Sequence, residues 1–144
     1  MTRAERLLVA FLRVGGTVCA LATVAVFMPR EWMAVCHERL GLGAFPDGPI
    51  VDYLARSTSM FYAILGVVLW LLSRDVRRFG GSITAVGAVT IAGGAVLLTI
   101  DLRSGLPQWW IAVEGPFVIG IGALMLILAV RARRSAQDAA QRQA

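Results

Sequence analysis

The chain has 144 residues, of which 58% are hydrophobic and only 16% are charged, and its mean hydropathy is +0.72. A soluble domain of this size would have too little polar surface to cover its apolar residues, so the composition favours an integral membrane protein. The net charge of +5 comes from arginine alone, because the chain has no lysine. The arginines flank apolar runs instead of forming a basic stripe, which argues against a nucleic-acid partner.

Four segments are apolar enough, and long enough, to cross a hydrocarbon layer of roughly 30 Å, which takes about 20 helical residues. They cover residues 7–28, 52–73, 82–101 and 108–130. Short connections between the last three favour antiparallel neighbours. We therefore predict an all-α fold, an integral membrane four-helix up-and-down bundle formed by residues 1–134. Residues 135–144 are predicted to be a polar cytoplasmic tail.

The first apolar segment has a second interpretation, a cleavable signal peptide. Arg3 and Arg6 precede it, and residues 20–22 form a small-residue motif typical of a cleavage site. Against this, Arg13 interrupts the apolar run, and the run continues to Met28, beyond the usual length of a signal. We favour a retained helix.

The long connection between the first two spans is predicted to contain a short amphipathic helix over residues 31–40. Trp32, Cys36 and Leu40 repeat every four residues, which indicates one apolar face lying in the outer membrane interface. Gly41 is expected to end this helix, and the sequence Pro46-Asp47-Gly48-Pro49 to turn the chain back. The segment is either a lid over a cavity or a passive interfacial anchor.

Cysteine and histidine predict no metal site and no redox centre. Cys19 lies within the first span and Cys36 in the following loop, too far apart in depth for a disulfide unless the loop dips inward. His37 is the only histidine, and a single histidine on an outer helix is usually solvated.

The positions of the arginines predict the orientation, because cytoplasmic segments of membrane proteins retain positive charge. Three clusters fall on one side only if both termini are cytoplasmic, which places the protein in an inner membrane. The clusters are Arg3 and Arg6; Arg74, Arg77 and Arg78; and Arg131, Arg133, Arg134 and Arg142. The outer side is expected to carry an interfacial aromatic belt of Trp32, Tyr53, Trp109 and Trp110.

Three charged residues inside or at the edge of the spans are the candidate binding residues: Arg56, Asp101 and Glu114. Each would cost about 2.5–3.5 kcal/mol at the centre of a lipid-exposed helix. We therefore expect them to face the bundle interior and to share a polar pocket near the outer side. In the alternative, Asp52 satisfies Arg56 and Arg103 satisfies Asp101 locally, while Glu114 has no nearby partner.

Small residues predict where the third and fourth spans approach one another. Gly87, Thr90 and Gly94 form a stripe on the face that ends at Asp101. Gly115 and Gly122 share a face of the last span. Pro116, beside Glu114, removes a backbone hydrogen bond and is expected to kink that helix or to free a carbonyl. The candidate pocket lies where these surfaces meet.

Several motifs resemble small bacterial DoxX-like membrane proteins. They are Tyr53-Leu54-Ala55-Arg56, Arg74-Asp75, Ile100-Asp101 followed by Gly105-Leu106-Pro107, and Glu114-Gly115-Pro116. The resemblance covers roughly residues 53–130. It implies a four-helix membrane protein, and for some members an association with respiratory or sulfur-oxidising complexes. It implies no catalytic residue.

Two classes of function remain. The first is a protein that binds a small amphiphile, such as a lipid or a quinone, or that is an accessory subunit of a larger membrane complex or a homo-oligomer. The second is a small membrane enzyme that transfers protons with Glu114 and Arg56. Because the sequence shows no nucleophile-base pair, metal cluster or phosphate loop, we favour the first. The ligand itself is not predicted, and a catalytic residue or cofactor is not assigned.

Overall fold

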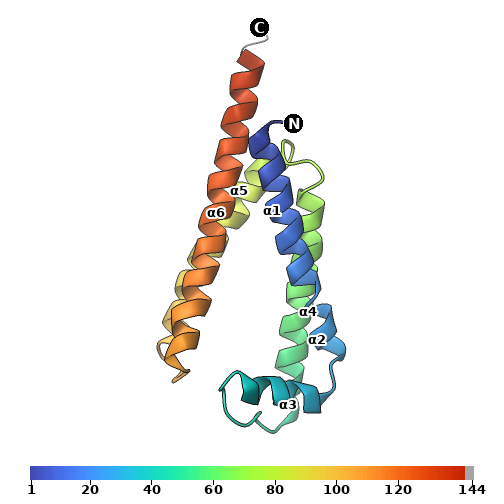
Figure 1. The fold of residues 1–144 in the computed structure, drawn as a ribbon, viewed down its shortest axis with the longest axis vertical. Helices are drawn as coiled ribbons and strands as arrows, with labels where there is room; N and C mark the ends of the chain where they lie inside the picture. Colours follow the sequence, from blue (N-terminus) through green and yellow to red (C-terminus); the bar gives the residue numbers. More distant parts are fainter. Residues whose placement is uncertain (142–144) are drawn as a thin grey trace. The chain divides into compact units, whose positions relative to one another are not determined.

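The structure is a computed structural model that describes residues 1–141, and these residues form helices and no strand (Figure 1). Arg142, predicted to belong to the third arginine cluster, lies outside the described residues, as do the last two positions of the predicted tail. The helices are α1 (Arg3–Ala20), α2 (Thr23–Phe27), α3 (Arg30–Arg39), α4 (Pro49–Leu72), α5 (Gly80–Asp101) and α6 (Gln108–Gln141).

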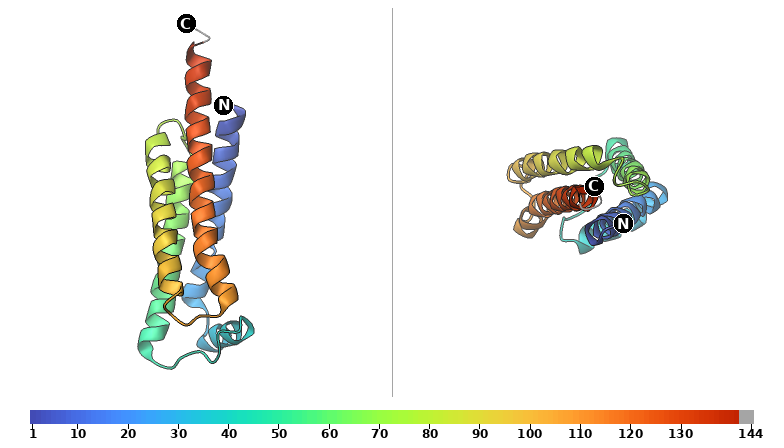
Figure 2. Two further views of the ribbon diagram at one scale, coloured as in Figure 1. Left: turned by 90° about the vertical axis from the view of Figure 1, so that its left-hand side faces the viewer. Right: turned by 90° about the horizontal axis from the view of Figure 1, so that it is seen from above.

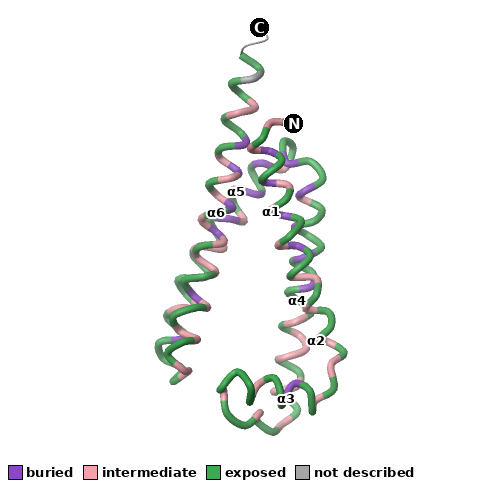
Figure 3. The backbone as a smooth tube through the Cα atoms, viewed as in Figure 1, coloured by how far each residue is buried: buried purple, intermediate pink, exposed green. Residues whose placement is uncertain are grey.

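Four helical segments of the described chain are long and apolar enough to span a membrane, which confirms the prediction of a multi-pass membrane protein. They are Arg3–Phe27, Pro49–Leu72, Gly80–Asp101 and Gln108–Asp138. In each, only 17% of the most apolar stretch is buried. Figure 3 shows the same feature as long exposed and half-buried stretches on every helix. Lipid or other protein surfaces must therefore cover most of these side chains.

The predicted boundaries of the four spans agree with the structure to within four residues, except at the end of α6. The first span begins at Arg3 instead of Leu7, and it is not one continuous helix, because α1 ends at Ala20 and α2 resumes at Thr23. At the break, the amides of Ala22, Val24 and Ala25 bond to the third residue back instead of the fourth. Such tighter turns commonly interrupt helices.

The last helix differs from the prediction at its far end. The membrane span was predicted to end near residue 130 and residues 135–144 to be a polar, frayed helix end, whereas α6 continues without interruption to Gln141. Alanine, arginine and glutamine dominate residues 131–141, and all three are strong helix formers, so the polar sequence carries on the helix that the apolar sequence begins. The helix also passes through Pro116 without ending.

The chain divides into two compact units, residues 1–12 with 72–144 and residues 13–71. In the first, α5 and α6 lie side by side and antiparallel (Figures 1 and 2). A Cβ added at Gly87 would meet the Gly122 carbonyl at 3.2 Å, and one at Gly94 would meet the Ile119 amide nitrogen at 2.8 Å. One at Gly115 would lie 2.9 Å from the Cα of Leu98. The predicted small-residue faces are thus confirmed.

In the second unit, glycines likewise bring the backbones of α1 and α4 into close contact. A Cβ added at Gly66 would lie 2.5 Å from the carbonyl oxygen of Gly16 and 2.6 Å from the backbone nitrogen of Ala20. At Gly16, an added Cβ would lie 2.9 Å from the Gly66 carbonyl. Because later positions of α1 meet earlier positions of α4, the two helices run antiparallel. Only glycine permits backbones to approach this closely.

Adjacent glycines in α5 allow a test of this packing. A Gly94→Ala substitution places its methyl group against the α6 backbone, so the variant should lose about 1–3 kcal/mol of unfolding free energy through overpacking. Gly93→Ala is the matched control, because nothing lies within 4 Å of its Cβ position. Alanine there should be neutral or stabilising by up to about 1 kcal/mol through helix propensity. Thermal unfolding in detergent measures both; equal effects would contradict the close contact.

Candidate functional site

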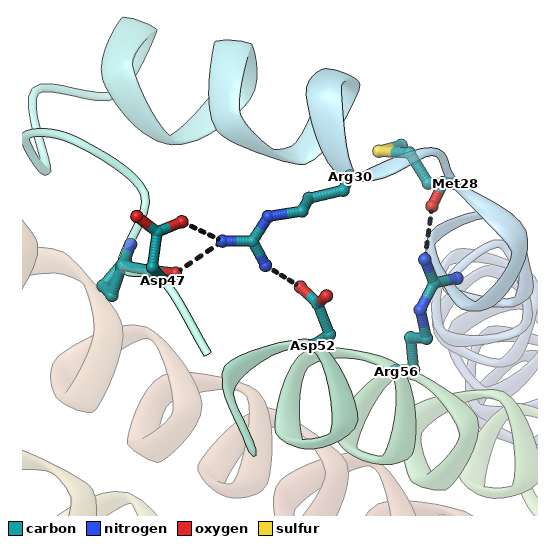
Figure 4. Close-up of polar contacts among 6 residues, drawn as sticks. Met28, Arg30, Asp47, Asp52 and Arg56 are labelled. Atoms are coloured by element: carbon teal, nitrogen blue, oxygen red, sulfur yellow. Dashed lines mark hydrogen bonds and ion pairs between the residues drawn. The ribbon is translucent and has the colours of Figure 1, made fainter. Parts of the chain in front are cut away.

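Arg56, a predicted site residue, lies on α4 and donates hydrogen bonds to two backbone carbonyls of the same unit. Its Nη2 lies 3.0 Å from the Met28 carbonyl oxygen (Figure 4), and its Nη1 bonds to the Val26 carbonyl. These carbonyls belong to the end of α2, where a helix leaves its last carbonyls without partners. A guanidinium there also complements the negative end of the helix dipole. Arg56 therefore caps the C-terminus of α2.

Arg30, at the start of α3, fastens the following loop to the first turn of α4. Its Nη2 lies 2.9 Å from both the Pro46 carbonyl oxygen and Asp47 Oδ1, and its Nη1 pairs with Asp52 (Figure 4). The guanidinium also lies 5.0 Å from the centre of the Phe45 ring. One arginine thus joins the start of α3 to the end of the loop and to the first turn of α4, and Asp52 has its cationic partner here. The predicted local pairing of Asp52 with Arg56 is wrong.

The helix predicted over residues 31–40 is present as α3, followed by Gly41 and Gly43 at φ values of 72° and 85°. The three apolar residues of the predicted face, Trp32, Cys36 and Leu40, are exposed, whereas the adjacent Met33 is buried. This outward apolar face is compatible with either predicted role, lid or anchor, and its place in a membrane interface stays a prediction.

His37 is not simply solvated, as its isolation in the sequence predicted. Its Nδ1 lies 2.9 Å from the Gly43 carbonyl oxygen, and its ring meets Phe45 edge-on at 5.4 Å between centres. Both contacts hold the loop that Arg30 also fastens. Within residues 1–141, no group of three histidine, cysteine or acidic side chains is placed to hold a metal ion, and both cysteines are free.

Asp101 is the most deeply buried of the three predicted site residues, with 3% of its surface exposed. It follows Gly87 and Gly94 at seven-residue spacing, so it lies on the α5 face that packs on α6. Its Oδ2 is buried and receives no hydrogen bond from any described residue. The alternative partner, Arg103, forms no ion pair with it in this part of the chain. A buried carboxylate oxygen without a donor costs free energy.

Glu114 has a nearby partner, contrary to the sequence-based expectation. The indole Nε1 of Trp110, one helical turn earlier on α6, donates a hydrogen bond to Glu114 Oε2. Trp110 itself packs edge-on against Trp109, with 5.4 Å between ring centres. The prediction from the sequence considered only charged partners for Glu114, but the indole N–H of a tryptophan four residues earlier on a helix can also reach the carboxylate.

The three predicted residues thus have separate local environments. Asp101 and Glu114 belong to the first unit, and no hydrogen bond joins their side chains among the described residues. Arg56 belongs to the second unit. A pocket shared by all three stays a prediction.

Two charged residues that were not predicted as site residues, Glu5 and Arg77, form an ion pair. Arg77 donates from Nε to Glu5 Oε1 at 2.6 Å and from Nη2 to Oε2 at 3.1 Å. Glu5 is 1% exposed. The hydrogen bond to Glu5 and the negative charge of Glu5 raise the pKa of the Arg77 guanidinium, which favours its charged form. Glu5 therefore anchors the α4–α5 connection to the start of α1.

A signal for Glu5 was present in the sequence. Thr2-Arg3-Ala4-Glu5 fits a capping box, in which a Thr hydroxyl and a Glu carboxylate exchange bonds with each other's backbone N–H. The structure contains both bonds, from Glu5 N to Thr2 Oγ1 at 3.2 Å and from Thr2 N to Glu5 Oε2 at 2.7 Å. The capping box explains why α1 begins four residues before the predicted start.

Arg13, which interrupts the first apolar run, also has a partner. Its guanidinium carbon lies 5.3 Å from the centre of the Trp70 ring on α4, and the Trp70 Nε1 donates to Thr17 Oγ1 at 3.2 Å. A cation over an indole face is favourable. This contact accounts for an arginine within the first span.

No known protein family, curated protein or solved structure matches this chain. The resemblance to DoxX-like proteins stays a prediction, and the residues and their contacts carry the functional argument.

The Arg30 cluster allows a comparison of two carboxylates that share one guanidinium. Arg30 and Asp52 have side chains 33% and 32% exposed, whereas that of Asp47 is fully exposed. Asp52→Asn should therefore lower the unfolding free energy by about 1 kcal/mol, and Asp47→Asn by clearly less. A double-mutant cycle with Arg30→Gln in detergent measures the coupling. If the Arg30–Asp52 cycle is additive, the ion pair does not stabilise the loop.

Proposed function

We propose that this protein is an integral membrane protein that binds a small amphiphile, a lipid or a quinone, at the end of the α5–α6 pair that contains Asp101. The proposal includes a role as an accessory subunit of a membrane complex, in which such binding commonly occurs between helices. What supports it is the Asp101 carboxylate, which is 3% exposed and has one oxygen without a donor.

The chemistry of that oxygen defines the class of ligand. A hydroxyl or amine of a bound molecule would donate to it and remove the cost of burying it unpaired. The apolar surface of the neighbouring spans would take the hydrophobic part of the same molecule. Among the described residues near that end, Ser104 and Arg103 are exposed and add polar groups for a headgroup. An amphiphile with a hydroxylated head, such as a reduced quinone or a glycerol lipid, has both parts.

The alternative of an enzyme that moves protons between Glu114 and Arg56 gains no support from the contacts. Arg56 donates to the carbonyls of Val26 and Met28, and Glu114 accepts from Trp110. A general acid or base needs an open approach for its substrate. Both groups are already engaged in bonds that stabilise helices.

We also propose an inner-membrane location with both termini in the cytoplasm. One cavity of the first unit is lined by Glu5, Arg77 and Arg133, which come from the three arginine-rich segments. These segments therefore share one end of the unit, and that end is expected to face the cytoplasm under the positive-inside rule.

Asp101→Asn tests the ligand proposal. The amide keeps the size of the side chain but replaces a carboxylate oxygen, so retention of the bound amphiphile should fall about 10–100-fold, as expected for losing a hydrogen bond to a charged group. Lipids and quinones extracted from the purified protein are quantified by mass spectrometry. Asp138→Asn, at an exposed position of α6, is the control and should retain the wild-type amount. Equal retention by both variants would contradict the proposal.

Fusions of alkaline phosphatase test the orientation. An enzyme joined to the end of the chain should be inactive because it stays in the cytoplasm, whereas one inserted near Asp47 should be active because it is exported. Both fusions are compared at equal expression. Activity at the end of the chain and none at Asp47 would reverse the proposed orientation.

A further inference from the structure

The first unit contains a cavity of about 210 Å³ at the end where the arginine-rich segments meet. It is lined by the start of α1, the α4–α5 connection, and α6, through Glu5, Val76, Arg77, Ala132, Arg133, Ala136 and Gln137. Asp101 and Gly80 stand at opposite ends of the 22-residue α5, about 30 Å apart at 1.5 Å per residue. The cavity is therefore separate from the ligand site proposed above.

Arg77 is held so that part of its guanidinium points away from its carboxylate partner. Glu5 accepts from Nε and Nη2, and no described residue accepts from Nη1. The Arg77 side chain is 62% exposed, while Glu5 beneath it is 1% exposed. Glu5 is thus a buried support that fixes the guanidinium plane and leaves one edge for an anion.

Arg133 supplies a second cation that no described carboxylate neutralises. Its aliphatic stem lies across Gly80, with Cγ and Cδ 3.5 Å from the position of an added Cβ. The side chain lines the cavity and is exposed, and no ion pair or hydrogen bond engages its guanidinium among residues 1–141. A long arginine stem packed on an apolar surface keeps its charged head in water.

The charge around the cavity is strongly positive. Residues 1–6, 74–78 and 131–134 contain eight arginines and two acids, Glu5 and Asp75. The floor is apolar, since Val76 and Ala132 are 8% and 5% exposed. A ligand for this cavity needs an anionic head and an apolar part beside it.

We propose that the cavity binds the phosphate group of an anionic phospholipid, with Arg77 and Arg133 donating to the phosphate oxygens. Basic pockets between helices at a membrane surface bind such headgroups. Gln137 can donate from its amide to the same group. The small side chains of Ala132 and Ala136 leave space for the glycerol portion.

Arg133→Gln tests the proposal without disturbing the ion pair of Glu5. Purified protein in detergent is titrated with phosphatidylglycerol, with phosphatidylcholine and with glycerol 3-phosphate, and bound molecules are counted by native mass spectrometry. Wild-type protein should retain phosphatidylglycerol over phosphatidylcholine. Arg133→Gln should weaken phosphatidylglycerol binding about fivefold, the effect of one arginine near an anionic surface. Arg134→Gln is the matched control, because it removes the same charge from α6 without lining the cavity.

The outcomes distinguish a phospholipid headgroup from a soluble phosphate compound, and a specific site from diffuse attraction to the positively charged surface. Binding of glycerol 3-phosphate that is lost in Arg133→Gln, without retention of the lipid, would assign the phosphate to a soluble molecule and overturn the lipid proposal. Equal losses in Arg133→Gln and Arg134→Gln would mean only diffuse attraction, and equal retention of both lipids would mean no headgroup selectivity. Either would overturn the site. The difference between Arg133→Gln and Arg134→Gln does not depend on Asp101, so failure here is distinct from failure of the amphiphile proposal.

Discussion

Backbone contact through glycine is the constraint on which each helix pair depends. In a lipid environment, apolar side chains gain little by leaving lipid for protein, so helices associate through close packing. Gly16 and Gly66 bring α1 against α4, and Gly87, Gly94, Gly115 and Gly122 bring α5 against α6. The remaining helix surfaces are free to be covered by lipid. These contacts also decide which helix ends, and therefore which charged residues, lie near one another.

Most of the charged side chains described above have partners nearby, and several of these partners are uncharged. Arg56 bonds to carbonyls at the end of α2, Arg13 lies over an indole, and Glu114 accepts from Trp110. Only Arg30 and Arg77 form ion pairs with acids among the described residues. Asp101 differs from all of these, because one of its buried oxygens has no donor. This contrast is the reason why the proposed ligand site is placed at Asp101.

Much of the fold was predictable because hydropathy and glycine spacing are local properties of the sequence. The four spans, the helix after the first span and the small-residue faces of α5 and α6 follow from them. The partners of the charges were not predictable in the same way. Arg30 meets Asp52 only because a 22-residue separation is closed by the loop, and Arg56 meets carbonyls at the C-terminal end of α2, 28 and 30 residues away in the sequence. Glu5 was missed although its capping box is local.

The length of α6 has a mechanical consequence. Its 34 residues extend about 51 Å at 1.5 Å per residue, well beyond a hydrocarbon layer of roughly 30 Å. Glycine contacts fix residues 115–126 of this helix to α5, and the polar turns at its end continue the same helix without interruption. Because the helix is continuous, a tilt of α5 and α6 within the bilayer would displace the polar turns of α6 outside it.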